Sequence, residues 1–173
     1  MKSNNIFFIP LRYILGLLLL FSLPLIYQIL TPLTTYYLKF ILDIFYNVTI
    51  ISCEKIIVNF SQIEIIPSCI AGSAYLLLLI LNLTTSMGFK KRIYSILFSF
   101  SLLFLINTLR LFILITLIVY DSKYFNITHK LFWYLLSTIF VIMIWFLTTK
   151  LFNINKIPIY SDIKHLIKNI KQK

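Results

Sequence analysis

Residues 67–74 read Pro-Ser-Cys-Ile-Ala-Gly-Ser-Ala and join a β-rich segment to a long apolar run. Pro67 and Ser68 favour the start of a helix, because proline fixes φ and serine caps free N–H groups. The sequence therefore predicts that Cys69 lies in the first turn of a helix that continues through Leu81. The helix dipole stabilises a thiolate in that turn, so we expect an acidic, nucleophilic cysteine.

The composition is that of an integral membrane protein. Of the 173 residues, 60% are hydrophobic and only 12% are charged, which excludes an ordinary soluble domain. The net charge of +11 does not indicate nucleic acid, because most basic residues flank apolar runs, where membrane orientation requires them. We therefore expect the lipid bilayer as a partner, and no nucleic acid.

Four apolar runs predict four transmembrane helices, at about 11–30, 69–88, 93–120 and 129–148. The first run is longer than the core of a signal peptide and lacks a small-residue cleavage site, so we expect it to be retained. The predicted fold is an all-α polytopic membrane protein. Residues 1–150 form a single membrane domain in this prediction, and residues 151–173 form a basic cytoplasmic tail.

Two shorter elements are expected between the first and second spans. In residues 33–48 a polar side chain recurs at every fourth position, namely Thr35, Lys39, Asp43 and Asn47. This spacing favours an amphipathic helix on the outer surface of the membrane. Residues 49–66 are rich in alternating β-branched residues, with Ser61-Gln62 as the turn candidate, and predict a hairpin. Because an open sheet edge cannot face hydrocarbon, the hairpin must lie outside the bilayer or against other protein.

The distribution of positive charge predicts the orientation in the membrane. If both ends of the chain and the loop at residues 90–92 are cytoplasmic, that side holds 11 of the 16 basic residues, namely Lys2, Arg12, Lys90, Lys91, Arg92, Lys150, Lys156, Lys164, Lys168, Lys171 and Lys173. Four of the five acidic residues then lie on the outer side. The positive-inside rule therefore predicts a multi-pass protein of the cell membrane with cytoplasmic ends.

Three reactive or charged side chains fall near the outer leaflet in this topology. Cys69 begins the second span, Arg110 lies within the third and His129 begins the fourth. A guanidinium inside an apolar run costs several kcal/mol unless it is paired or faces a wet cavity, so Arg110 indicates a functional site. Asn107 lies one turn earlier on the same helical face, where it can hold Arg110. We expect the three side chains to meet in one pocket that opens to the exterior.

These residues together indicate nucleophilic acyl transfer. The Cys69 thiolate would attack a carbonyl, His129 would carry the proton to the leaving amine, and Arg110 would stabilise the oxyanion or the thiolate. Each also has a structural alternative, since a cysteine is a common core residue and a histidine a common interfacial one. A disulfide between Cys53 and Cys69 is a further alternative. The sequence shows no cluster of metal ligands and no glycine-rich loop, so we expect no metal and no cofactor.

The order of these residues resembles the archaeosortase and exosortase family of membrane transpeptidases. A cysteine follows a short β segment at the head of a span, an Asn-x-x-Arg motif lies in the next span, and a histidine opens the span after it. Here these residues are Cys69, Asn107 with Arg110, and His129, and the resemblance covers about residues 33–147. It implies that Cys69 is the nucleophile and that Arg110 and His129 are its partners.

The resemblance also implies a substrate class: secreted proteins with a C-terminal sorting signal made of a short motif, a transmembrane helix and a basic cluster. Such an enzyme would cut at the outer face of the cell membrane and transfer the new C-terminus to an acceptor such as a lipid. The small side chains of Gly72, Ser73 and Ala74 would suit docking of the substrate helix. The alternative function is a noncatalytic membrane assembly or carrier subunit, in which Arg110 binds an anionic group.

Overall fold

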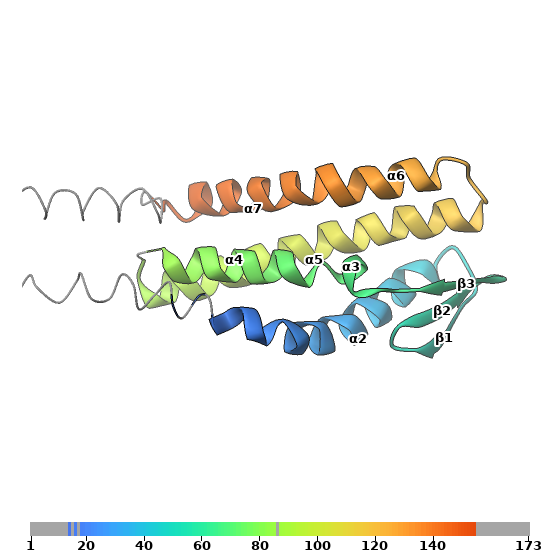
Figure 1. Ribbon diagram of the computed structural model, residues 1–173, viewed down its shortest axis with the longest axis horizontal. Helices are drawn as coiled ribbons and strands as arrows, with labels where there is room; N and C mark the ends of the chain where they lie inside the picture. Colours follow the sequence, from blue (N-terminus) through green and yellow to red (C-terminus); the bar gives the residue numbers. More distant parts are fainter. Residues whose placement is uncertain (1–13, 15, 17, 86, 155–173) are drawn as a thin grey trace, which may run out of the picture.

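The computed structural model describes residues 14, 16, 18–85 and 87–154. The start of the predicted first span and residues 155–173 of the predicted tail lie outside the described residues. The described chain is mostly helical and has one three-stranded sheet (Figure 1). Its elements, in chain order, are η1 (Leu19–Ser22), α2 (Leu23–Leu42), β1 (Val48–Ser52), β2 (Lys55–Val58), β3 (Ser61–Glu64), α3 (Pro67–Ile70), α4 (Gly72–Thr84), α5 (Phe89–Val119), α6 (Phe125–Leu131), η2 (Phe132–Leu136) and α7 (Ser137–Leu151).

Two helices of the described chain are long and apolar enough to cross a membrane, namely Leu19–Leu42 and Phe89–Val119. The second of these, α5, has 31 residues. At 1.5 Å per residue it extends about 45 Å, which exceeds the roughly 30 Å of a hydrocarbon core. The predicted span at 93–120 therefore corresponds to a helix that can cross a bilayer.

The other two predicted spans do not stand as single helices. The 13 residues of α4 are too few to cross a bilayer alone. The last predicted span is divided, because the axis bends by 44° between Phe125–Leu135 and Ser137–Leu151. If these two helices form one bent transmembrane segment, they are a third candidate span. Four spans are thus not confirmed.

The first long helix does not end at Pro32, as the sequence predicted. It continues through Pro32 to Leu42, so no separate surface helix exists over residues 33–48. The reason is burial of this half of α2: Thr35 is fully buried, and its hydroxyl donates a hydrogen bond of 2.6 Å to the carbonyl oxygen of Cys53. Packing against the sheet therefore outweighs the backbone hydrogen bond that proline removes.

On the exposed side of the same helix, Lys39 and Asp43 form the pair that their four-residue spacing predicts. The Lys39 ammonium lies 2.9 Å from a carboxylate oxygen of Asp43, one turn later. Both side chains are exposed to a similar extent, as expected for an i, i+4 pair on a helix surface. Two members leave the predicted polar stripe: Thr35 is buried against the sheet, and Asn47 lies beyond the end of the helix at Leu42.

The predicted hairpin is a three-stranded antiparallel meander, in the order β1-β2-β3. Its second turn lies at Asn59-Phe60, and Ser61 pairs with Val58 as the first residue of β3. Asn59 has φ 55°, a left-handed conformation that asparagine adopts more readily than most residues. The prediction of a turn at Ser61-Gln62 was therefore wrong by two residues.

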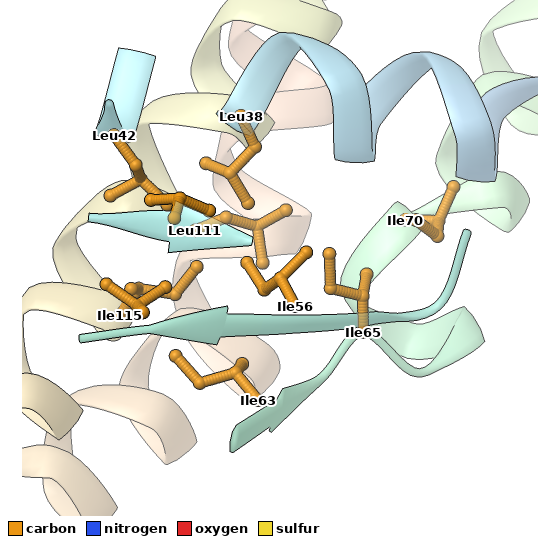
Figure 2. Close-up of a cluster of buried hydrophobic side chains, with 10 residues drawn as sticks. Leu38, Leu42, Ile56, Ile63, Ile65, Ile70, Leu111 and Ile115 are labelled. Atoms are coloured by element: carbon orange, nitrogen blue, oxygen red, sulfur yellow. The ribbon is translucent and has the colours of Figure 1, made fainter. Parts of the chain in front are cut away.

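One face of the sheet packs against α2 and α5 (Figure 2). The buried side chains of this cluster are Leu38, Leu42, Val48, Ile56, Val58, Ile63, Ile65, Ile70, Leu111 and Ile115. The sheet thus lies against other parts of the protein, beside the ends of α2 and α5 (Figure 1). Ile70 of α3 joins the same cluster, which fixes the turn that carries Cys69.

The α5 helix is the centre of the helical part, since it contacts α2, α4, α6 and α7. A second apolar cluster joins α4, α5 and α7 through Tyr75, Leu78, Leu103, Val141 and Ile144. The segment of α5 between the two clusters contains Asn107 and Arg110, both of which are buried. The two apolar clusters therefore hold these polar side chains against α3.

Candidate functional site

Cys69 lies in α3, a separate helical turn of four residues. Ala71 has φ 58° and ψ 35°, so the chain leaves the right-handed helix there and α4 begins at Gly72. The predicted continuous helix from Cys69 through Leu81 is therefore wrong. A single turn has few aligned peptide dipoles, so the helix dipole that was expected to acidify the thiol is largely missing.

Burial raises the pKa of the Cys69 thiol, and the positive charge of Arg110 opposes this effect only in part. The α3 turn lies outside the helices that could span a membrane. A raised pKa keeps the resting sulfur protonated at neutral pH. Burial therefore opposes the acidic thiol that the sequence predicted, and nucleophilic attack by a protonated sulfur needs a base to accept the proton.

Asn107 and Arg110 of α5 bind the backbone carbonyl groups of α3. The Arg110 guanidinium donates to the carbonyl oxygen of Cys69 at 3.0 Å and to that of Ser68 at 3.4 Å. The Asn107 amide donates to the Cys69 carbonyl at 2.9 Å and to that of Ile70 at 3.4 Å. Because the last carbonyls of a helical turn have no intrahelical partner, these two side chains complete the turn and set its position.

His129 lies in α6, near the end of the helix. Its ring stacks on Phe125, with centroids 5.6 Å apart and planes at 2°, and meets the edge of Trp133 at 5.9 Å. These residues follow one another at i, i+4, so they share one face of the helix. Trp133 belongs to the π-helical turn η2, which directly follows α6, and such turns are frequent at functional sites.

Cys69, Arg110 and His129 line one narrow cavity. The other side chains around it are Ser68, Leu114, Phe132 and Trp133. Its volume of about 10 Å³ gives room for no more than about one water molecule. The structure thus brings together the three side chains that the sequence singled out, from α3, α5 and α6.

A larger cavity of about 360 Å³ lies beside the narrow one and shares with it Ser68, Arg110 and Trp133. Its remaining lining comes from α2, α4, α7 and the residue between α3 and α4, namely Tyr27, Ala71, Ser73, Ala74, Leu77, Ser137, Thr138, Val141 and Ile142. This volume is in the range of small-molecule and peptide pockets. The lining combines polar side chains, such as Arg110 and Thr138, with apolar ones, such as Leu77 and Ile142.

The three small residues predicted to dock a substrate helix have different surroundings. Ser73 and Ala74 line the larger cavity. Gly72 is buried instead against α2, where a Cβ atom would lie 2.6 Å from a ring carbon of Tyr27. Gly72 therefore allows close packing of α4 on α2.

Sequence reasoning gave Ser68 only a helix-capping role and did not single out Trp133, yet both residues line both cavities. The N-cap of α3 is Ile66, and this end of the helix has no side-chain cap hydrogen bond, so the predicted capping by Ser68 is wrong. The Ser68 hydroxyl and the Arg110 Nε–H are buried and have no hydrogen-bond partner among the described residues. Ser68 and Trp133 could both have been predicted from their spacing to the other site residues, since the first directly precedes Cys69 and the second lies one helical turn after His129.

Cys53 lies outside both cavities, in the turn between β1 and β2. Both cysteines are free thiols, and the Cys53 side chain is exposed. The alternative of a disulfide between Cys53 and Cys69 is therefore not supported. Within the described part of the chain, no three His, Cys, Asp or Glu side chains cluster as metal ligands do.

Comparisons of this chain with protein-family models, curated proteins and solved structures find no match. The chemistry of the cavities is therefore argued from their own geometry. A thiol, an imidazole and a guanidinium around one small space form a set suited to covalent catalysis at a carbonyl group.

Proposed function

We propose that this protein is a membrane-embedded cysteine transpeptidase, similar to the archaeosortases and exosortases. The observation that carries the proposal is the narrow cavity, because Cys69, Arg110 and His129 line it together from three different elements. Polar side chains are costly inside an apolar helical bundle, so three of them around one cavity indicate a functional site. Two of the three, Cys69 and Arg110, are also held in place by hydrogen bonds between α5 and α3.

In the proposed reaction, the Cys69 sulfur bonds to the carbonyl carbon of the substrate and its proton passes to His129. The carbon–nitrogen bond then breaks, and the leaving amine takes the proton from the imidazole. The product on the enzyme is a thioester, which an acceptor nucleophile resolves. This sequence is consistent with the raised pKa of the thiol, because His129 serves as the base that the protonated sulfur needs.

The proposed substrates are secreted proteins whose C-terminal signal consists of a short motif, a transmembrane helix and a basic cluster. The larger cavity lies beside the narrow cavity that Cys69 lines, and we expect it to receive the substrate residues next to the scissile bond. Cleavage would occur at the outer face of the cell membrane, with both chain ends cytoplasmic. The acceptor of the acyl group is a lipid or another nucleophile.

The test is processing of a co-expressed protein that carries such a signal, measured by the shift in its mass. Cys69→Ala should abolish processing while the protein stays inserted and folded. The matched control is Cys53→Ala, which removes an exposed thiol outside both cavities and should process normally. Normal processing by Cys69→Ala would overturn the proposal and favour the noncatalytic carrier, in which Arg110 binds an anionic group.

A further inference from the structure

Two polar atoms next to Cys69 are buried without a partner: the hydroxyl oxygen of Ser68 and Nε of Arg110. Arg110 as a whole is only 9% exposed. Both residues line the narrow cavity and the larger one, so their side chains lie where the two spaces meet. A ligand that passes from the larger cavity to the sulfur therefore passes these two residues.

Neither atom makes a hydrogen bond of normal geometry within the fold, although the Ser68 hydroxyl lies close enough to the Cys69 sulfur to favour its thiolate slightly. The terminal guanidinium nitrogen of Arg110 holds the carbonyl groups of Ser68 and Cys69, and this leaves Nε–H unused. A buried polar group without a partner costs about 1–3 kcal/mol, and such groups are rare in native proteins. Alanine at position 68 would avoid the cost of the hydroxyl. The two atoms therefore indicate a hydrogen-bond acceptor that the fold itself does not supply.

We propose that the Ser68 hydroxyl and the Arg110 Nε–H form the oxyanion site of the enzyme, a role that rests on the transpeptidase function proposed above. When the Cys69 sulfur bonds to the carbonyl carbon, the electron pair of the C=O π bond moves to the oxygen. The two donors then hold the resulting negative charge, and the charge returns to the C=O bond when the amine leaves. Ser68 is thereby a further catalytic residue, and Arg110 has two roles, since another of its nitrogens positions α3.

The experiment compares two reagents that modify the same sulfur in a Cys53→Ser background. An N-acetylated dipeptide aldehyde adds to the thiol and forms a thiohemiacetal, whose oxygen takes the place of the oxyanion. Iodoacetamide alkylates the thiol with loss of iodide and makes no oxyanion. Only the first reaction needs the proposed donors. Both modifications are measured on the full-length protein by intact mass.

Ser68→Ala should weaken aldehyde binding by about 100-fold, the usual effect of removing one oxyanion donor. It should slow alkylation by iodoacetamide far less, because the Ser68 hydroxyl is only the smallest of the influences on the pKa of the Cys69 thiol. Ser68→Thr, which keeps a hydroxyl, should restore most of the aldehyde affinity. The matched control is Ser99→Ala, which removes a buried hydroxyl of α5 that bonds only within its own helix.

Unchanged aldehyde affinity in Ser68→Ala would overturn the oxyanion site and leave the transpeptidase proposal intact. An equal decrease in aldehyde affinity and in the rate of alkylation would also overturn it, because Ser68 would then act on the position or reactivity of the sulfur. A wild-type protein that forms no adduct at Cys69 with the aldehyde would instead overturn the proposed function, and the oxyanion site with it.

Discussion

Arg110 of α5 donates a hydrogen bond of 3.0 Å to the carbonyl oxygen of Cys69. The residue that the sequence suggested as a partner of the sulfur thus also holds the backbone of the same cysteine. Its charge lies close enough to favour the thiolate, although burial outweighs that effect. Position and electrostatics at Cys69 therefore both depend on one side chain, and substitutions should affect them together.

The pH dependence of Cys69 alkylation tests how burial and the charge of Arg110 affect the thiol. Since burial raises the pKa of the thiol, the midpoint of iodoacetamide labelling in a Cys53→Ser background should lie above about 8.5, the value of a free cysteine. Arg110→Gln removes the charge that favours the thiolate and should move the midpoint further up. Arg92→Gln is the control, because Arg92 also binds a helix-end carbonyl, that of Thr85, but lies far along the chain from Cys69. A midpoint below that of a free cysteine would contradict the structure.

Removal of the Asn107 amide tests the positioning of α3. Asn107→Ala deletes the donor that binds the carbonyl groups of Cys69 and Ile70. We expect a loss of about 1–3 kcal/mol in unfolding free energy in detergent, because the Ile70 carbonyl loses its side-chain donor and the Cys69 carbonyl keeps only Arg110. Thr108→Ala is the control on the same helix, since its hydroxyl bonds only to the carbonyl of Phe104 and should cost less. If the two variants lose the same unfolding free energy, the hydrogen bonds from Asn107 to α3 stabilise the protein no more than a hydrogen bond within α5.

The close approach of α4 to α2 predicts an effect of one methyl group. Gly72→Ala places a Cβ atom within 3 Å of the Tyr27 ring and should destabilise the protein by about 1–3 kcal/mol, as overpacking of a filled core does. The control is Gly88→Ala, because a Cβ atom there meets nothing within 4 Å. Thermal unfolding of the two variants in the same detergent provides the measurement. A stable Gly72→Ala variant would mean that α2 and α4 lie farther apart.

The left-handed conformation of Ala71 predicts a stabilising substitution. Ala71→Gly should raise the stability by about 1 kcal/mol, since glycine adopts positive φ without the clash of a Cβ atom. Ala74→Gly should instead lower the stability by about 1 kcal/mol, because Ala74 lies in the regular helix α4, where glycine is unfavourable. If both substitutions destabilise the protein equally, α3 and α4 form one continuous helix.

The sheet core predicts a further contrast between two isoleucines. Ile56 of β2 is fully buried between the sheet and the helices, whereas Ile51 of β1 is 57% exposed. Ile56→Ala should cost about 2–5 kcal/mol of unfolding free energy, the range for truncation of a core aliphatic side chain. Ile51→Ala should cost far less. Similar losses for the two variants would argue against packing of this sheet on α2 and α5.

Much of the local structure followed from residue patterns. The apolar run at 93–120 became α5, and the alternating segment became strands, because burial periodicity is a local property of the chain. The spacing of Lys39 and Asp43 produced their ion pair for the same reason. The first strand, β1, and the turn at Asn59 were missed, although asparagine is a typical residue for a left-handed turn position.

The sequence by itself determined that this chain is apolar and mostly helical, and it singled out a cysteine, an arginine and a histidine far apart along it. Only the tertiary structure decided that α2 continues past Pro32, that Cys69 sits in an isolated turn and that Ser68 shares its cavity. Each of these depends on contacts between residues distant in the sequence, such as Thr35 with Cys53 and Arg110 with Cys69. Local propensity is weak beside such contacts, because burial in the assembled fold decides which backbone groups must find a partner.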